Sequence, residues 1–169
     1  KDCYEAARKM DPTRPVHYEG TRIDREFGGS AYSDFYSKMY PSMDWMAKNT
    51  SNMDKPMFLC EYAHAMGNAI GNLPEYMQSM EESNSTIGGC IWDWVDQAVY
   101  EPLEPKKGAP RLHTGYDFPG PHQGNFCSNG VVTAERRQTA KLAEVKFAHQ
   151  FIKFQYADGT LTLRNAYDF

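Results

Sequence analysis

The stretch Met57-Phe-Leu-Cys-Glu-Tyr62 decides the fold of this chain of 169 residues. It is an almost continuous apolar run, which is typical of a strand covered on both faces. Soon after it, residues 73–83 carry apolar side chains at the spacing of an amphipathic helix, and Pro74 suits its first turn. A buried strand followed by a surface helix is the repeating unit of parallel α/β folds, so we expect a parallel sheet with right-handed crossovers.

The same alternation extends to both sides of this unit. Ser42 is a suitable N-cap for a short helix, and Asp158-Gly159 supplies the turn of a hairpin of alternating apolar residues. A two-stranded ribbon is marginal by itself, so the hairpin is expected to begin a larger sheet, and both ends of the chain look cut. The sequence predicts strands over 16–19, 34–40, 57–62 and 87–95, helices ending at Met10 and over 42–48, 73–83 and 139–149, and a hairpin within 151–169.

Polar residues cluster where the predicted strands end. Glu19, Tyr40, Glu61 with His64, and the pair Asp93 and Asp96 all occupy such places. In a (β/α)8 barrel, catalytic groups come from the C-terminal ends of several strands. Four strands with their helices make half of such a barrel, which usually takes roughly 250 residues. The expected fold class is therefore α/β, as half of a TIM barrel.

Composition and charge exclude two classes of partner. The chain has 18 Lys and Arg against 22 Asp and Glu, a formal net charge of −4, whereas a nucleic-acid binder normally shows a basic surface. No stretch approaches the roughly 18 apolar residues that a membrane span needs. Aromatic residues make up 14% of the chain, which suits a sugar-binding surface and a large core equally.

Four blocks of sequence carry a family resemblance. Residues 58–68, Phe-Leu-Cys-Glu-Tyr-Ala-His-Ala-Met-Gly-Asn, strongly resemble the nucleophile motif of the large β-galactosidases of glycoside hydrolase family 2. Residues 88–97 resemble the next strand of that family, residues 125–132 a third block and residues 38–40 a fourth, all in family order. The β-glucuronidases and β-mannosidases share a strand-end Glu but not this string, so the β-galactosidases are favoured.

The resemblance implies a retaining glycosidase mechanism. Such an enzyme needs one carboxylate to attack the anomeric carbon and a second carboxyl to protonate the leaving oxygen. The resemblance makes Glu61 the nucleophile and places the acid/base in an Asn-Glu pair, which this sequence lacks. Glu19 lies in a Tyr-Glu-Gly context that does not match, so we do not assign that role to it. The isolated chain is accordingly expected to be inactive.

The resemblance also assigns further site residues. Tyr40 would hydrogen-bond the nucleophile, while His64, Trp92 and Asn129 would contact the sugar. Without the motif, a core Tyr, a solvated loop His and a packed Trp are the plainer interpretations. Trp94, two residues beyond Trp92, is expected to face the same side of a strand.

Cofactors, partners and domains follow from the same resemblance. Asn129 and the backbone carbonyl of Phe126 would contribute to a Na⁺ site, and the Mg²⁺ ligands would lie mostly outside this sequence. The implied partners are a β-galactoside, the remaining domains of a longer chain and further copies in a homo-oligomer. Cytoplasm and bacterial periplasm are both compatible locations. The implied domains are 1–149, the C-terminal half of the barrel, and 150–169, the first strands of a β-sandwich.

Two other functions compete with this interpretation. A non-catalytic carbohydrate-binding module would explain the aromatic content and the hairpin without a carboxylate at a strand end. Glu61-Tyr-Ala-His64 also has the Glu-x-x-His spacing of di-iron helical bundles, which requires a helix and a second such motif.

Overall fold

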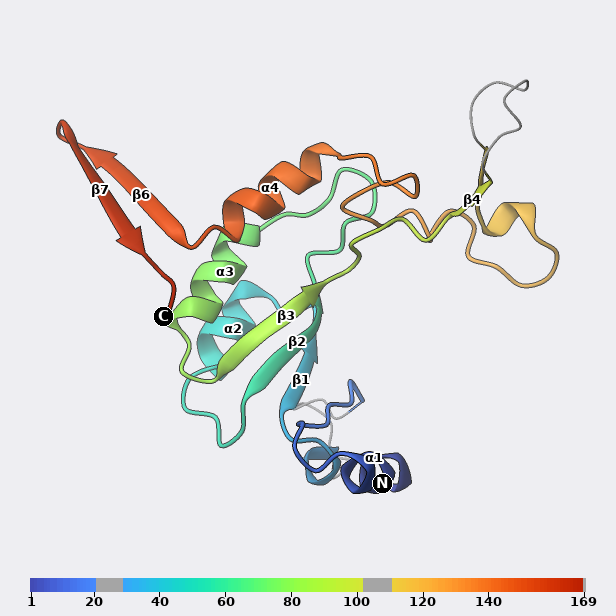
Figure 1. The fold of residues 1–169 in the computed structure, drawn as a ribbon, viewed down its shortest axis with the longest axis horizontal. Helices are drawn as coiled ribbons and strands as arrows, with labels where there is room; N and C mark the ends of the chain where they lie inside the picture. Colours follow the sequence, from blue (N-terminus) through green and yellow to red (C-terminus); the bar gives the residue numbers. More distant parts are fainter. Residues whose placement is uncertain (21–28, 102–110, 169) are drawn as a thin grey trace.

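A three-stranded parallel sheet forms the centre of the computed structural model, which describes residues 1–20, 29–101 and 111–168. Its order is β1-β2-β3, comprising Tyr36–Met39, Met57–Tyr62 and Thr86–Ile91. Helices α2 (Met43–Asn49) and α3 (Leu73–Glu82) make the two crossovers (Figure 1). The central strand and both helices lie where the sequence predicts them, to within a residue.

One face of this sheet carries the core. Met46 of α2, Leu59 and Tyr62 of β2, and Leu73 of α3 are each at most 1% exposed. Helix α4 (Ala140–Ala148) closes this layer with Val145 and Ala148. On the opposite face of β2, Phe58 packs edge-on to Phe35, with ring centroids 5.9 Å apart.

The strand predicted at residues 16–19 does not form, so within the described residues the parallel sheet has three strands rather than the expected four. The backbone N–H of Val16 donates to the Asp34 carboxylate at 2.6 Å, and the Val16 carbonyl accepts from the Asp34 N–H at 2.9 Å. The segment is therefore held by a side chain and one backbone bond rather than by a strand ladder. The predicted strand 34–40 is correspondingly shorter, beginning at Tyr36.

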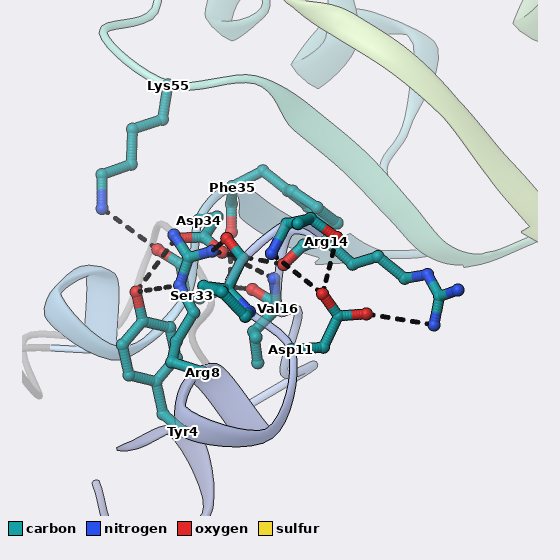
Figure 2. A network of polar contacts seen from close by, with 11 residues as sticks. Tyr4, Arg8, Asp11, Arg14, Val16, Ser33, Asp34, Phe35 and Lys55 are labelled. Carbon is teal, nitrogen blue, oxygen red and sulfur yellow. Dashed lines mark hydrogen bonds and ion pairs between the residues drawn. The ribbon is translucent and has the colours of Figure 1, made fainter. Parts of the chain in front are cut away.

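The same carboxylate of Asp34 anchors the N-terminal helix α1 (Asp2–Met10) (Figure 2). The Tyr4 hydroxyl donates to it at 3.0 Å, and Arg8 donates at 3.2 Å. Arg8 also reaches the carbonyl oxygens of Pro12 and Arg14 at 3.1 and 3.2 Å. Asp34 thus ties α1 and the following loop to the base of β1.

Two antiparallel pairs complete the described chain. Strands β4 (Val99–Glu101) and β5 (Arg111–His113) pair with each other, and residues 102–110 between them lie outside the described residues. Strands β6 (Ile152–Ala157) and β7 (Thr160–Asn165) form the predicted hairpin, which projects beyond α3 and α4 (Figure 1). No helix among the described residues is long and apolar enough to span a membrane.

Candidate active site

The candidate site is built where β1 and β2 end side by side. The two strands are parallel, and Met39 pairs with Glu61 after a shift in register. The backbone then leaves β1 at Tyr40, which adopts the left-handed conformation with φ 46°. Tyr40 is fastened to Glu61 twice: its backbone N–H donates to the Glu61 carbonyl at 2.8 Å, and its hydroxyl donates to Glu61 Oε2 at 2.7 Å.

Burial and the neighbouring carboxylate act together on the Tyr40 phenol. Desolvation of the half-buried ring raises its pKa well above the ordinary value, and the hydrogen bond to Glu61 raises that pKa further. The phenol consequently keeps its proton across the physiological range and acts as a donor. Glu61 therefore has one carboxylate oxygen oriented by a fixed neutral donor.

His64 lies in the loop that leaves β2. Ala63, with φ 49°, turns the chain out of the strand, and the Ala65 N–H donates to the Trp92 carbonyl at 2.7 Å. The imidazole lies between the rings of Tyr40 and Phe126, with centroids 5.9 and 5.5 Å away. Its Nδ1 accepts from the Met66 N–H at 3.3 Å, while its buried Nε2 has no hydrogen-bond partner among the described residues.

Asn129 is the most enclosed polar residue of the group, at 2% exposure. Its Nδ2 donates to the Phe126 carbonyl at 3.0 Å, but its Oδ1 is buried and finds no partner in the described parts of the chain. Its backbone carbonyl accepts from the Asp93 N–H at 2.8 Å. The segment around Asn129 is thus hydrogen-bonded to the segment that follows β3.

Trp92 and Trp94 do not share a strand, contrary to the prediction. The predicted strand 87–95 ends at Ile91, so side-chain alternation does not extend to the two tryptophans. Trp92 is joined to the site through its backbone: its N–H donates to the Tyr62 carbonyl at 3.1 Å, and its carbonyl accepts from Ala65. Trp94 is 54% exposed and lines a surface hollow with Asp93, Ala134 and Arg136.

The structure brings the predicted site residues together to different degrees. Tyr40 contacts both the Glu61 carboxylate and the His64 ring, and Phe126 joins this group through the His64 ring. Asn129 is connected through the Phe126 carbonyl, and Trp92 through the loop after β2. The roles that the resemblance gives these residues stay predictions.

Two supporting residues had no such role in the sequence interpretation. Lys141 of α4 donates from its ammonium group to the Ala65 carbonyl at 2.6 Å. In the sequence it looks like an ordinary solvated lysine of a helix. Asp96 accepts from the Gly130 N–H at 2.7 Å. Asp96 was predicted only as a strand-end polar residue, and its partner lies 34 positions further along the chain.

The di-iron interpretation of Glu61 and His64 is wrong. Glu61 lies on strand β2 rather than on a helix, so the two side chains do not have the spacing of one helix face. Within residues 1–20, 29–101 and 111–168, no group of three or more His, Cys, Asp or Glu side chains could hold a metal ion.

Comparisons with known proteins identify the family of this chain. Residues 1–154 match the family model described as "Glycosyl hydrolases family 2, TIM barrel domain". Similar proteins include β-galactosidases from Staphylococcus xylosus (38% identity over 96% of this chain), Priestia megaterium (38% over 98%) and Kluyveromyces lactis (32% over all of it). The chain spans 17% of the length of each of these relatives.

A solved structure shares the fold. The family 2 β-galacturonidase from Eisenbergiella tayi, crystallised with galacturonate, superposes with a TM-score of 0.53 over 87% of this chain and 29% of its own. At 18% identity this likeness bears on the fold alone. Together with the parallel sheet and its helices, it identifies the architecture as a portion of a TIM barrel.

Proposed function

Because this chain belongs to glycoside hydrolase family 2, we propose that it forms part of the active site of a retaining β-galactosidase acting on terminal, non-reducing β-D-galactosides. The observation that carries the proposal is the Tyr40–Glu61 hydrogen bond of 2.7 Å between two adjacent parallel strand ends. The names of the similar bacterial and yeast enzymes support the choice of galactosides.

In the proposed mechanism, Glu61 is the nucleophile. Its carboxylate attacks the anomeric carbon while a second carboxyl, roughly 5–5.5 Å away, protonates the departing glycosidic oxygen. The same second residue then removes a proton from water, which attacks the anomeric carbon of the galactosyl-enzyme and releases Glu61. We place this second carboxyl in an Asn-Glu pair outside this chain, which contains no such dipeptide.

Tyr40 would act on both halves of this reaction. Its proton, retained because the pKa is raised, orients Glu61 for attack. When the covalent intermediate breaks down, the same donor stabilises the carboxylate that forms on Glu61. A non-catalytic sugar-binding module would have no use for a carboxylate held in this way.

The sugar would be held by His64, Trp92 and Asn129. The buried Nε2 of His64 and Oδ1 of Asn129 both lack partners within the described residues, and hydroxyl groups can serve both. A hydrophobic ring such as that of Trp92 suits the apolar face of a pyranose. Discrimination would come mainly from the polar pair, because a substrate without the matching hydroxyl leaves buried groups unpaired.

A bound Na⁺ fits the residues present in part. The Phe126 carbonyl and the orphaned Asn129 Oδ1 are neutral oxygens, which is the donor type that hard cations prefer, and the bond from Asn129 Nδ2 to that carbonyl holds the two residues together. Such an ion would supply positive charge beside the sugar hydroxyls. We propose that its remaining ligands, and most of those for Mg²⁺, belong to the rest of the protein.

We also propose a domain division at residue 149. Residues 1–149 would form the C-terminal half of the barrel, and residues 150–169 the first strands of a β-sandwich. The chain exposes 11,845 Å², whereas a compact monomer of 19.3 kDa exposes about 8,500 Å². Exposed apolar side chains such as Phe154, Leu161 and Leu163 would be covered by the other domains of a longer, homo-oligomeric enzyme, and the chain alone would be inactive.

The test is to label and mutate Glu61 in the full-length protein. A 2-fluoro galactoside should become attached to Glu61, as located by peptide mass spectrometry. Glu61→Gln should lower kcat by several orders of magnitude with little change in thermal stability. Glu144→Gln, at an exposed position of α4, is the matched control and should leave kcat unchanged. Labelling at Glu19 or Asp93 would overturn the assignment.

A further inference from the structure

Lys141 makes a contact that the stability of its own helix does not explain. It lies in the first turn of α4, where a positive charge is unfavourable beside the unpaired N–H groups of the helix. Its ammonium group instead reaches the Ala65 carbonyl at 2.6 Å, across 76 positions of sequence. Ala65 is completely buried and Lys141 is partly buried, so this charge-assisted bond is only partly open to solvent.

The carbonyl that Lys141 binds belongs to the peptide group between Ala65 and Met66. The N–H of that same peptide group donates to His64 Nδ1 at 3.3 Å. An ammonium group on the oxygen side of a peptide polarises it and strengthens the donor on the nitrogen side. Lys141 is therefore connected to the His64 ring through one peptide unit.

This connection fixes which nitrogen of His64 carries the proton. A backbone N–H can only donate, so Nδ1 must be the acceptor and the ring proton lies on Nε2. Nε2 is buried, without a partner among the described residues, and the ring is flanked by Tyr40 and Phe126. His64 thus presents a single, oriented N–H donor, and its ring contacts Tyr40, whose hydroxyl is bonded to Glu61.

We propose that Lys141 is a positioning residue, which acts through the Ala65–Met66 peptide to hold His64 as an Nε2–H donor toward a hydroxyl oxygen of the bound sugar. This inference rests on the proposed function, because it assumes that a sugar binds beside Glu61. The Ala65 N–H is held by the Trp92 carbonyl, so loss of Lys141 would loosen the loop that joins both sugar contacts.

The experiment is a double-mutant cycle in the full-length protein with an aryl β-galactoside, with rates expressed per active site titrated by a 2-fluoro galactoside. Lys141→Met should lower kcat/KM about tenfold, which corresponds to a hydrogen bond to a charged group. Lys141→Arg, which keeps the charge, should stay within about threefold of wild type. Lys146→Met, at an exposed position of the same helix, should change kcat/KM less than twofold.

The decisive measurement combines Lys141→Met with His64→Phe. If Lys141 acts through His64, the double variant matches His64→Phe to within twofold. A full additional tenfold loss in the double variant, or no effect of Lys141→Met alone, overturns the inference. Lys141→Gln replaces Lys141→Met if the latter does not fold. A wild-type protein that hydrolyses no galactoside overturns the proposed function instead, and this inference with it.

Discussion

The central sheet and the β6–β7 hairpin have equally regular sequences, but the sheet is buried and the hairpin is exposed. Met57, Leu59 and Tyr62 of β2 are at most 1% exposed, whereas every residue of β7 is exposed. In the hairpin, the cross-strand pairs Phe154–Leu163 and Tyr156–Leu161 form an apolar face that nothing in the described chain covers. Alternation of side chains determines that a strand forms, but burial requires a second layer, and among the described residues β1–β3 have one while the hairpin does not.

The largest difference should appear between a glycine packed against the chain that follows the central sheet and a glycine in the hairpin turn. A Cβ on Gly130 would lie 2.1 Å from the Asp96 nitrogen and 2.4 Å from the Val95 carbonyl carbon. Gly130→Ala should therefore destabilise the barrel domain by about 4 kcal/mol, near the upper end for single substitutions. Differential scanning calorimetry of the full-length protein provides the measurement.

Gly159 in the hairpin turn is the matched control. It has φ +75° and nothing within 4 Å of an added Cβ, so Gly159→Ala meets only the backbone penalty of about 1 kcal/mol. Equal losses for the two alanine variants would show that Gly130 is not confined as the structure indicates.

Leucine truncation provides the next largest contrast. Leu59 is completely buried, so Leu59→Ala should cost about 3 kcal/mol by removing transfer energy and leaving a cavity. Leu163 is 66% exposed, and Leu163→Ala should cost less than about 0.5 kcal/mol if its face stays uncovered. Urea unfolding of both variants measures the difference. A cost above about 1.5 kcal/mol at Leu163 would show that another part of the full-length protein packs on the hairpin.

Local sequence patterns sufficed for most elements and for part of the site. The apolar run of β2, the cap at Ser42 and the turn at Asp158 act within a few residues, so their elements were predicted closely. The proximity of Tyr40 and Glu61 follows from two neighbouring parallel strands. The strand at 16–19 failed because a distant carboxylate, Asp34, takes its backbone donor.

Long-range polar contacts account for what the sequence could not show. The bond from Lys141 to Ala65 spans 76 positions, and that from Gly130 to Asp96 spans 34. Neither leaves a periodic signal, because one charged residue on a helix looks the same whether it is solvated or paired. The side-chain alternation assumed for Trp92 and Trp94 failed for a related reason, since the strand ends at Ile91, before both tryptophans.

The stability of the region around β1 should also depend more strongly on pH than that of the hairpin does. The Val16 N–H, and to a lesser extent the Tyr4 hydroxyl and Arg8, hold the pKa of Asp34 below its ordinary value of 3.8. A lowered pKa in the folded state means that Asp34 stabilises the fold above pH 4, and that this contribution is lost as pH falls through the lowered value. Asp34→Asn should cost about 1–2 kcal/mol at pH 7.

Thermal unfolding between pH 7 and pH 2.5 distinguishes the ionised carboxylate from a purely steric effect. The deficit of Asp34→Asn should shrink as pH falls, because wild type loses its charge while the variant has none to lose. Tyr4→Phe, which removes one donor, should show a smaller deficit of the same sign. A deficit for Asp34→Asn that stays constant with pH would contradict the role of its charge.

The smallest effect is expected at the joint between the two regions. Glu81 of α3 pairs with Lys153 at 3.0 Å and Arg164 at 3.4 Å, which are cross-strand neighbours on the polar face of the hairpin. All three side chains are partly exposed, so Glu81→Gln should cost less than about 0.5 kcal/mol and less still in high salt. At low salt, Glu81→Gln should slightly raise the rate of hydrogen exchange in residues 152–165. The control Glu144→Gln, at an exposed position of α4, should leave that rate unchanged. A cost of Glu81→Gln above about 2 kcal/mol would mean that the hairpin is docked on the barrel as firmly as the helices are. The central sheet and the hairpin would then differ only in which of their faces is buried.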